Sequence, residues 1–145
     1  MKNITNVNIF ISMKLIEILN EMVSHPFPNN KTITFKTEDG KEVSVDCEHA
    51  ITSEEKMTGV LGLEDMGEFN GVLFDGVSPS YYHMKGVKFP LDMVFCDENK
   101  ILDISYAEPD GKNIYPPKGA IYNIELNGGF CDKHNIKKGD NFYMS

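Results

Sequence analysis

Short runs of alternating apolar and polar residues, separated by glycine, proline and asparagine, constrain the fold of this chain more than any other feature. In the segment 31–49, KTITFKTEDGKEVSVDCEH, Ile33 and Phe35 alternate with polar residues before Asp39-Gly40, and the same alternation resumes after it. A period of two is that of a strand with one buried face, and glycine tolerates the positive φ of a tight turn. The segment is therefore predicted to form a β-hairpin.

Further segments of the same kind follow along the chain. Strand patterns recur in GVLFDG, SYYHMKG, PLDMVFCD, KILDISYAE and AIYNIELN, with a last short strand in KKGDNFYM. No alternation of strands with helices is evident, so a parallel sheet is not expected. The predicted fold class is α+β and mostly β: an antiparallel sheet curled into a partial barrel of about seven or eight short strands, with two or three short helices.

Helical patterns are few and short in this part of the chain. Thr52 with Glu55 three residues later is a capping-box pattern, which predicts a short helix with Met57, Val60 and Leu61 on its buried side. The segment GGFCDKHNI predicts a second short helix or turn. Between these helices, PDGKNIYPPKG at 109–119 is a long loop rich in proline and glycine, and such loops often carry binding residues.

The N-terminal segment has a different pattern and is interpreted as an appendage. Residues 14–23, KLIEILNEMV, predict an amphipathic helix. Its apolar stripe, at the spacing i, i+3, i+4 and i+7, consists of Leu15, Ile18, Leu19 and Met22. The next segment, SHPFPNN, reads as a linker because proline and asparagine break regular structure. We therefore expect an extension over 1–30 and one β-rich domain over 31–144.

Charge and composition exclude several classes of partner. The net charge is −8, which disfavours nucleic acid and anionic membrane surfaces. No apolar run reaches the roughly 18 residues of a membrane span. All 14 basic residues are lysine, and lysine, asparagine and isoleucine are plentiful while tryptophan is absent. This bias is typical of an AT-rich genome, such as that of a phage, a virus or some bacteria, so we expect a cytoplasmic protein, or a virion protein if it is phage-encoded.

Cysteine and histidine spacing predicts no metal, no cofactor and no disulfide framework. The three cysteines are odd in number and lack CxxC spacing, which fits a reducing compartment. The four histidines, at positions 25, 49, 83 and 134, are scattered, so a metal site joining His49 or His83 to Asp92 or Cys47 is not expected. Cys131 and His134 would share a helix face, but no orienting third group is recognisable, so no catalytic residue is predicted.

The ordered set of motifs resembles a known family. The segments TSEEKMTGVLG, GVLF, HMKGVKFPLDMVFCDENKIL, YPP and IYNIELNGGFCDKHNIKKGD are similar to domain-of-unknown-function family 192 over residues 50–144. The resemblance implies a compact antiparallel β barrel with a short helix, and no established activity. His83 replaces a tryptophan common in the family and Gly86 replaces an asparagine, so the resemblance implies no aromatic ligand contact there. Residues 1–30 have no counterpart in the family core.

Two interpretations of the charged residues remain open. In the first, Asp92 is structural: it points away from the apolar row of its strand and accepts N–H bonds from the bend between Gly86 and Pro90. In the second, Asp92, Lys85 and Glu125 converge at the mouth of the barrel and bind a small polar molecule. The candidate ligand-binding set is His83, Lys85, Asp92, Glu125 and Asn127.

These interpretations lead to two functional hypotheses. The favoured one is a non-enzymatic binding or structural accessory domain that holds a protein partner, in a viral or phage setting. Its candidate partner contacts lie on the N-terminal helix, at Leu15, Ile18, Leu19 and Met22, and in the loop, at Tyr115. The alternative is a small-molecule-binding protein or hydrolytic enzyme with a polar pocket around Lys85, Asp92 and Glu125. Charged groups that converge in a closed pocket would favour the alternative.

Overall fold

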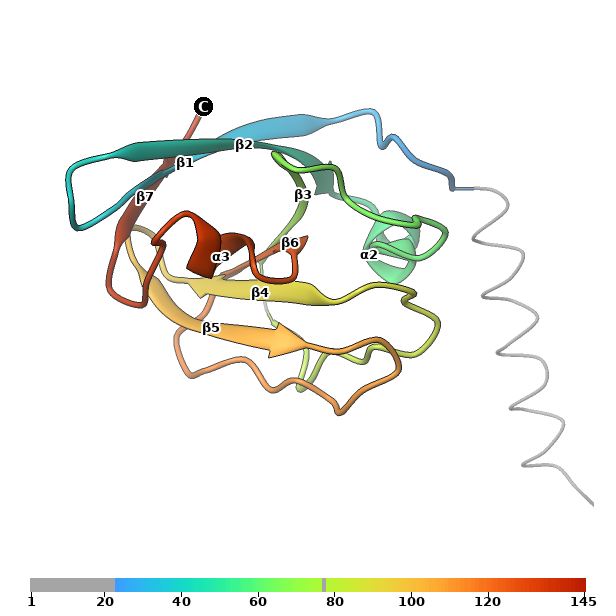
Figure 1. Ribbon diagram of the computed structural model, residues 1–145. Coiled ribbons are helices and arrows are strands. Elements are labelled where there is room, and N and C mark those ends of the chain that lie inside the picture. Colours follow the sequence, from blue (N-terminus) through green and yellow to red (C-terminus); the bar gives the residue numbers. More distant parts are fainter. Residues whose placement is uncertain (1–22, 77) are drawn as a thin grey trace, which may run out of the picture.

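The polypeptide is built around one curled, mixed β-sheet with two short helices (Figure 1). The computed structural model describes residues 23–76 and 78–145, so the predicted helix at 14–23 falls outside the described residues except for Val23. The elements are β1 (Asn30–Lys36), β2 (Glu42–Ala50), α2 (Ser53–Thr58), β3 (Asn70–Asp75), β4 (Leu91–Cys96), β5 (Ile101–Ala107), β6 (Tyr122–Asn127), α3 (Phe130–Lys133) and β7 (Asn141–Met144). The strand order is β5-β4-β6-β3-β2-β1-β7.

The hairpin predicted from Asp39-Gly40 is confirmed. Strands β1 and β2 pair antiparallel, and Gly40 adopts a φ of +83° in the turn between them. The sheet is not wholly antiparallel as predicted but mixed, because β2 and β3 run parallel. The connection that contains α2 makes this possible: a parallel pair needs a crossover of a dozen or more residues, and 51–69 supplies one.

The two ends of the sheet come together where β7 meets the start of β5. The Ile101 N–H donates to the Asp140 carbonyl at 2.9 Å, and the Gly139 N–H donates to the Ile101 carbonyl at 2.8 Å. Figure 1 shows the result: β1 and β2 lie on one side, β4 and β5 lie on the other, β7 runs from the first pair toward β5, and α3 lies between the two sides. The expectation of a mostly β fold with a curled sheet is therefore confirmed.

Strand alternation divides the apolar residues of the sheet into two cores. On β4, Val94 and Cys96 pack with Phe130 of α3 on the inner face. Leu91 and Met93 point the other way, into a second cluster beneath the segments that cover the outer face. Every residue of β4 is consequently buried. A strand buried on both faces is a fixed platform for any side chain that it or its neighbour β6 presents.

The outer face is covered by α2 and by irregular segments. The capping box is confirmed, since the Thr52 side chain accepts from Glu55 N–H and the Glu55 carboxyl accepts from Thr52 N–H. Val60 is buried, as predicted, but the prediction for Met57 is wrong, because Met57 is 52% exposed on the last turn of the helix. The strand predicted at SYYHMKG is also wrong, since it makes only an isolated bridge, between Tyr82 and Ile114.

Asp92 anchors α3 to the inner face of the sheet. Its carboxyl group is buried and accepts from the N–H groups of Gly129, at 3.0 Å, and Cys131, at 2.9 Å. The expected role as a backbone acceptor is therefore present, but at the start of α3. The bend at Gly86 does not use Asp92, because the Gly86 N–H donates to Asp110 Oδ1 instead.

Replacement of Asp92 tests this anchor. Asp92→Ala leaves two buried N–H groups without an acceptor and should lower the free energy of unfolding by about 3 kcal/mol. Asp92→Asn keeps one acceptor and should cost about 1–2 kcal/mol. Urea titration measures both. The matched control is Asp46→Ala, which removes only an exposed bond from Thr32 and should cost under about 0.5 kcal/mol. Equal losses for Asp92→Ala and Asp46→Ala would contradict the anchor.

Candidate functional site

A cavity of about 780 Å³ lies between the outer face of the sheet and the segments that cover it. Side chains of β3, β4 and β6 line its inner end, and residues within 56–62 and 79–87, together with Asn113 of the 109–119 loop, line the rest. The apolar walls come from Val60, Leu61, Phe74, Val87, Leu91 and Met93. Mostly apolar cavities with a few polar groups are the usual form of small-molecule sites. This cavity is therefore the leading candidate for a functional site.

Glu125 supplies the acidic group of the cavity lining. Strand pairing sets it between Val72 of β3 and Met93 of β4, and its side chain is only 4% exposed. Its Oε2 accepts from Asn123 Nδ2 at 2.9 Å. Burial raises the pKa of Glu125 from its ordinary 4.5 to about 7, and the Asn123 bond opposes only part of that rise. A carboxyl that titrates near neutral pH inside a cavity is a common mark of a functional group.

Asn123 is a residue that the sequence analysis missed. It is 1% exposed and lies two residues before Glu125, on the same face of β6. Its Oδ1 is buried and has no hydrogen-bond partner among the described residues. The available signal was the alternation itself: Asn123, Glu125 and Asn127 are polar at every second position of a strand whose other face carries Ile124 and Leu126.

Tyr82 also lines the cavity, although its aromatic ring was interpreted only as core. Burial, and secondly the charge of Glu125, raise the pKa of Tyr82 to about 12. The phenol therefore stays protonated at physiological pH and keeps an O–H donor near the acidic group. Its bridge to Ile114 ties this part of the cavity wall to the 109–119 loop.

Three of the five predicted ligand-binding residues belong to this cavity. His83 and Lys85 line it together with Glu125. Lys56 of α2, which the sequence analysis did not single out, lines it too. Its Nζ donates to the Asp75 carbonyl at 3.2 Å and lies 3.8 Å from an Asp75 carboxylate oxygen. The cavity thus combines a buried acid with basic groups at its edge.

The other two predicted residues have structural contacts. Asp92 lies on the opposite face of the sheet from Glu125, because it pairs with Leu126 in the register of β4 and β6. The predicted convergence of Asp92 with Lys85 and Glu125 is therefore wrong. Asn127 holds the turn before β3: its Oδ1 accepts from Met66 N–H and its Nδ2 donates to the Gly67 carbonyl, both at 3.0 Å.

The cysteines and histidines of the described chain form neither a metal cluster nor an activated thiol. Within residues 23–76 and 78–145, no cluster of three or more histidine, cysteine or acidic side chains could hold a metal ion. Burial raises the pKa of the Cys131 thiol above its usual range, which opposes a thiolate nucleophile beside His134. His49 Nε2 contacts Asp75 Oδ2 at 2.7 Å. Among the helices of the described chain, none is long and apolar enough to cross a membrane.

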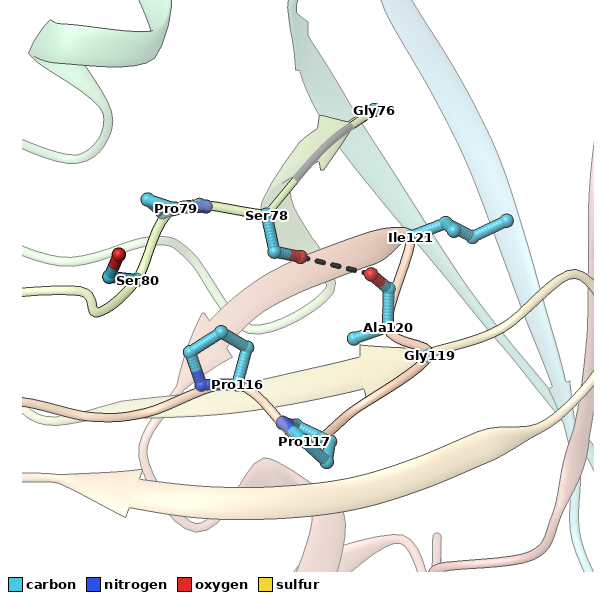
Figure 2. Close-up of a pocket in the computed structure, with 9 residues that line it drawn as sticks. All are labelled: Gly76, Ser78, Pro79, Ser80, Pro116, Pro117, Gly119, Ala120 and Ile121. Atoms are coloured by element: carbon cyan, nitrogen blue, oxygen red, sulfur yellow. Dashed lines mark hydrogen bonds between the residues drawn. The ribbon is translucent and has the colours of Figure 1, made fainter.

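A second hollow, of about 610 Å³, lies where the segment after β3 meets the 109–119 loop (Figure 2). Pro79 faces Pro116 and Pro117 across it, and the Ser78 hydroxyl donates to the Ala120 carbonyl at 3.0 Å. Tyr115, next to Pro116, is 67% exposed. Its ring centroid lies 6.0 Å from that of Tyr81, also exposed. Tyr115 of the proline-rich loop, the predicted partner contact, therefore lies beside exposed Tyr81 of the 79–87 segment.

The pKa of Glu125 makes a prediction for stability. Between pH 4.5 and 7 the folded protein holds a proton that the unfolded chain has released, so this group's stabilisation falls as pH rises through that window. Glu125→Gln removes the ionisable group and keeps an acceptor for Asn123. At pH 8 the variant should be more stable than the parent by up to about 3 kcal/mol.

The measurement is chemical unfolding at pH 4.5, 6, 7 and 8. Glu108→Gln is the matched control, because Glu108 is exposed and its variant should follow the parent curve. An unchanged pH dependence in Glu125→Gln would show that Glu125 titrates as an ordinary surface carboxyl.

Comparisons with known proteins agree with the fold. A crystal structure from Sinorhizobium meliloti 1021, described as a "putative transcription regulator", superposes with a TM-score of 0.76 at 24% identity, covering 83% of this chain and 98% of the other. A protein of unknown function from Novosphingobium aromaticivorans DSM 12444 gives 0.72 at 23% identity, covering 83% and 91%. No curated protein matches this sequence significantly. The family model "Uncharacterized ACR, COG1430" (DUF192) matches residues 34–144, and the chain therefore belongs to that family.

Proposed function

We propose that this domain binds a small organic molecule in the cavity above Glu125. The observation that carries the proposal is the position of that carboxyl: it is 4% exposed and lines an apolar cavity of about 780 Å³. Burying an ionisable group in such a place costs stability unless it is paired. Groups kept at such a cost commonly serve a ligand or a reaction. The proposal takes up the small-molecule alternative of the sequence analysis, without Asp92.

The apolar walls of the cavity and the acidic group at its inner end would contact different parts of the ligand. Leu61, Val87 and Met93 would contact the apolar body of the ligand, whose transfer from water supplies much of the affinity. Glu125 would fix the orientation of its polar head. Lys85 and His83, at the edge, would contact whatever part of the ligand remains near solvent. We propose binding rather than catalysis, because the hydrogen bond that Glu125 receives from the described residues comes from Asn123, so no candidate nucleophile on the lining is paired with it.

A fragment panel and a cavity-filling variant test this function. Ligand-observed NMR should find a subset of small aromatic fragments that bind the parent protein. Leu61→Trp places a larger ring in the cavity and should weaken their binding at least about tenfold. Circular dichroism checks that this variant is folded.

Tyr143→Trp is the matched control, since Tyr143 lies on β7 outside the cavity lining and is 44% exposed. Its variant should bind the same fragments as the parent. The proposal fails if no fragment binds, or if Leu61→Trp binds them as well as Tyr143→Trp does.

A second candidate function, contact with a protein partner, is favoured by the exposed pair Tyr81 and Tyr115. Rigid aromatic side chains on proline-rich loops make contacts at a low entropy cost. The stripe Leu15, Ile18, Leu19 and Met22 lies outside the described residues and stays a separate proposed partner contact. A photo-crosslinking amino acid in place of Tyr115 should give one discrete crosslinked protein when the variant is expressed in its native host. The same substitution at exposed Tyr106 should give none. Identical adduct patterns at the two positions would remove this candidate.

A further inference from the structure

The open hydrogen-bonding positions beside the acidic group of the cavity are acceptors. Glu125 Oε2 is occupied by Asn123 Nδ2 at 2.9 Å, and the described residues give Glu125 Oε1 no partner. Asn123 Oδ1, on the neighbouring side chain, is buried and also unpartnered among these residues, but Asn123 is not one of the residues that line the cavity. Each oxygen of a carboxylate can accept more than one bond, so Glu125 stays open to N–H or O–H donors from the cavity. The complementary head group is therefore one that carries several donors.

The charge of Glu125 has no protein partner either. Within the described chain, no lysine or histidine lies within ion-pair distance of its carboxylate. Lys56 is directed to Asp75, and Lys85 is exposed at the cavity edge, where water screens its charge. A buried carboxylate gains most from a cation that reaches it directly and displaces no existing partner.

We propose that the ligand of this cavity is an organic cation, with an amidinium or primary ammonium head that donates to the Glu125 carboxylate and an apolar body against the walls. This inference rests on the proposed function, since it names the chemical class of the ligand for the same site. An amidinium is the best geometric match, because its two N–H groups lie in one plane and can meet two acceptor oxygens at once.

A pH dependence follows from this pairing. The cation binds the ionised form of Glu125, whose pKa is about 7. A group with that pKa is about 97% ionised at pH 8.5 and about 3% at pH 5.5, so affinity should fall about 30-fold between them. The other titratable groups on the lining are Tyr81, Tyr82, His83 and Lys85 from the 79–87 segment and Lys56 from α2. The lining residues of β3 and β4, Phe74, Leu91 and Met93, do not titrate.

Benzamidine is the probe, and benzamide is its neutral counterpart of nearly equal shape. Both are titrated into the full chain at pH 8.5 and 5.5, with binding followed by calorimetry or by backbone NMR shifts. Benzamidine should bind at pH 8.5 with an affinity in the millimolar range, as expected for a fragment of this size. It should bind at least about tenfold more tightly than benzamide, because only the cation neutralises the carboxylate.

Three variants assign the effect to Glu125. Glu125→Gln should lose at least about tenfold in benzamidine affinity and most of its pH dependence, while benzamide binding stays within about threefold. Glu108→Gln, an exposed change of the same charge, should leave both unchanged and so excludes attraction by the overall negative charge. His83→Gln should retain at least about a tenfold pH effect, which excludes protonation of His83 as its main cause.

The outcomes separate this inference from the function on which it rests. Suppose benzamide binds as tightly as benzamidine at pH 8.5, and Leu61→Trp abolishes both. The cavity is then a ligand site for neutral molecules, and the inference of a cation is wrong. If benzamidine fails to bind, or binds Glu125→Gln as well as the parent, the inference is also wrong, and the fragment panel alone decides the proposed function.

Discussion

The pairing of β6 with both β3 and β4 is the constraint on which the rest of the structure depends. It places Ile124 and Leu126 in the inner core and turns Asn123 and Glu125 to the outer face. A shift of one residue in this register would exchange the faces and bury the polar pair in the wrong core. Gly71 of β3 allows the close approach, since a Cβ there would lie 2.7 Å from the Glu125 carbonyl oxygen.

Two carboxyl groups on neighbouring strands illustrate how the sheet separates structure from function. Asp92 of β4 faces inward, and each of its carboxylate oxygens accepts a backbone N–H bond at the start of α3. Glu125 of β6 faces outward and receives one amide N–H in an apolar cavity. The first arrangement stabilises the fold, because each donor would otherwise be buried without an acceptor. The second leaves acceptor capacity open, which a ligand can use.

Local patterns predicted local structure well. The Asp39-Gly40 turn and the Thr52–Glu55 capping box depend only on nearby residues, and both formed as expected. The parallel pairing of β2 with β3 was missed because its crossover contains a helix of only six residues, too short to read as a strand–helix–strand unit. The strand predicted around Tyr82 was wrong because its alternation reflects packing under a loop rather than sheet pairing.

The candidate site was only partly predictable for a related reason. Lys85 and Glu125 stood out by charge, and the cavity contains both. Asp92 stood out equally, yet its strand runs antiparallel to β6 with a register that turns it to the other face. Asn123 was overlooked because the polar alternation of Asn123, Glu125 and Asn127 is also the pattern of a solvent-exposed strand face, and only the fold shows that this face of β6 is buried. The charge of a residue identifies it as a candidate site residue, whereas the strand register determines which candidates lie on the same face of the sheet.

The central claim is that Glu125 is a buried acid poised at the inner end of a ligand cavity. Its most direct test is the titration of the Glu125 side-chain carboxyl by ¹³C NMR, assigned by comparison with Glu125→Gln. The account predicts a midpoint near the pKa of about 7 that burial produces, and a downward displacement when benzamidine is present. A midpoint near the ordinary 4.5, unaffected by the cation, would contradict it.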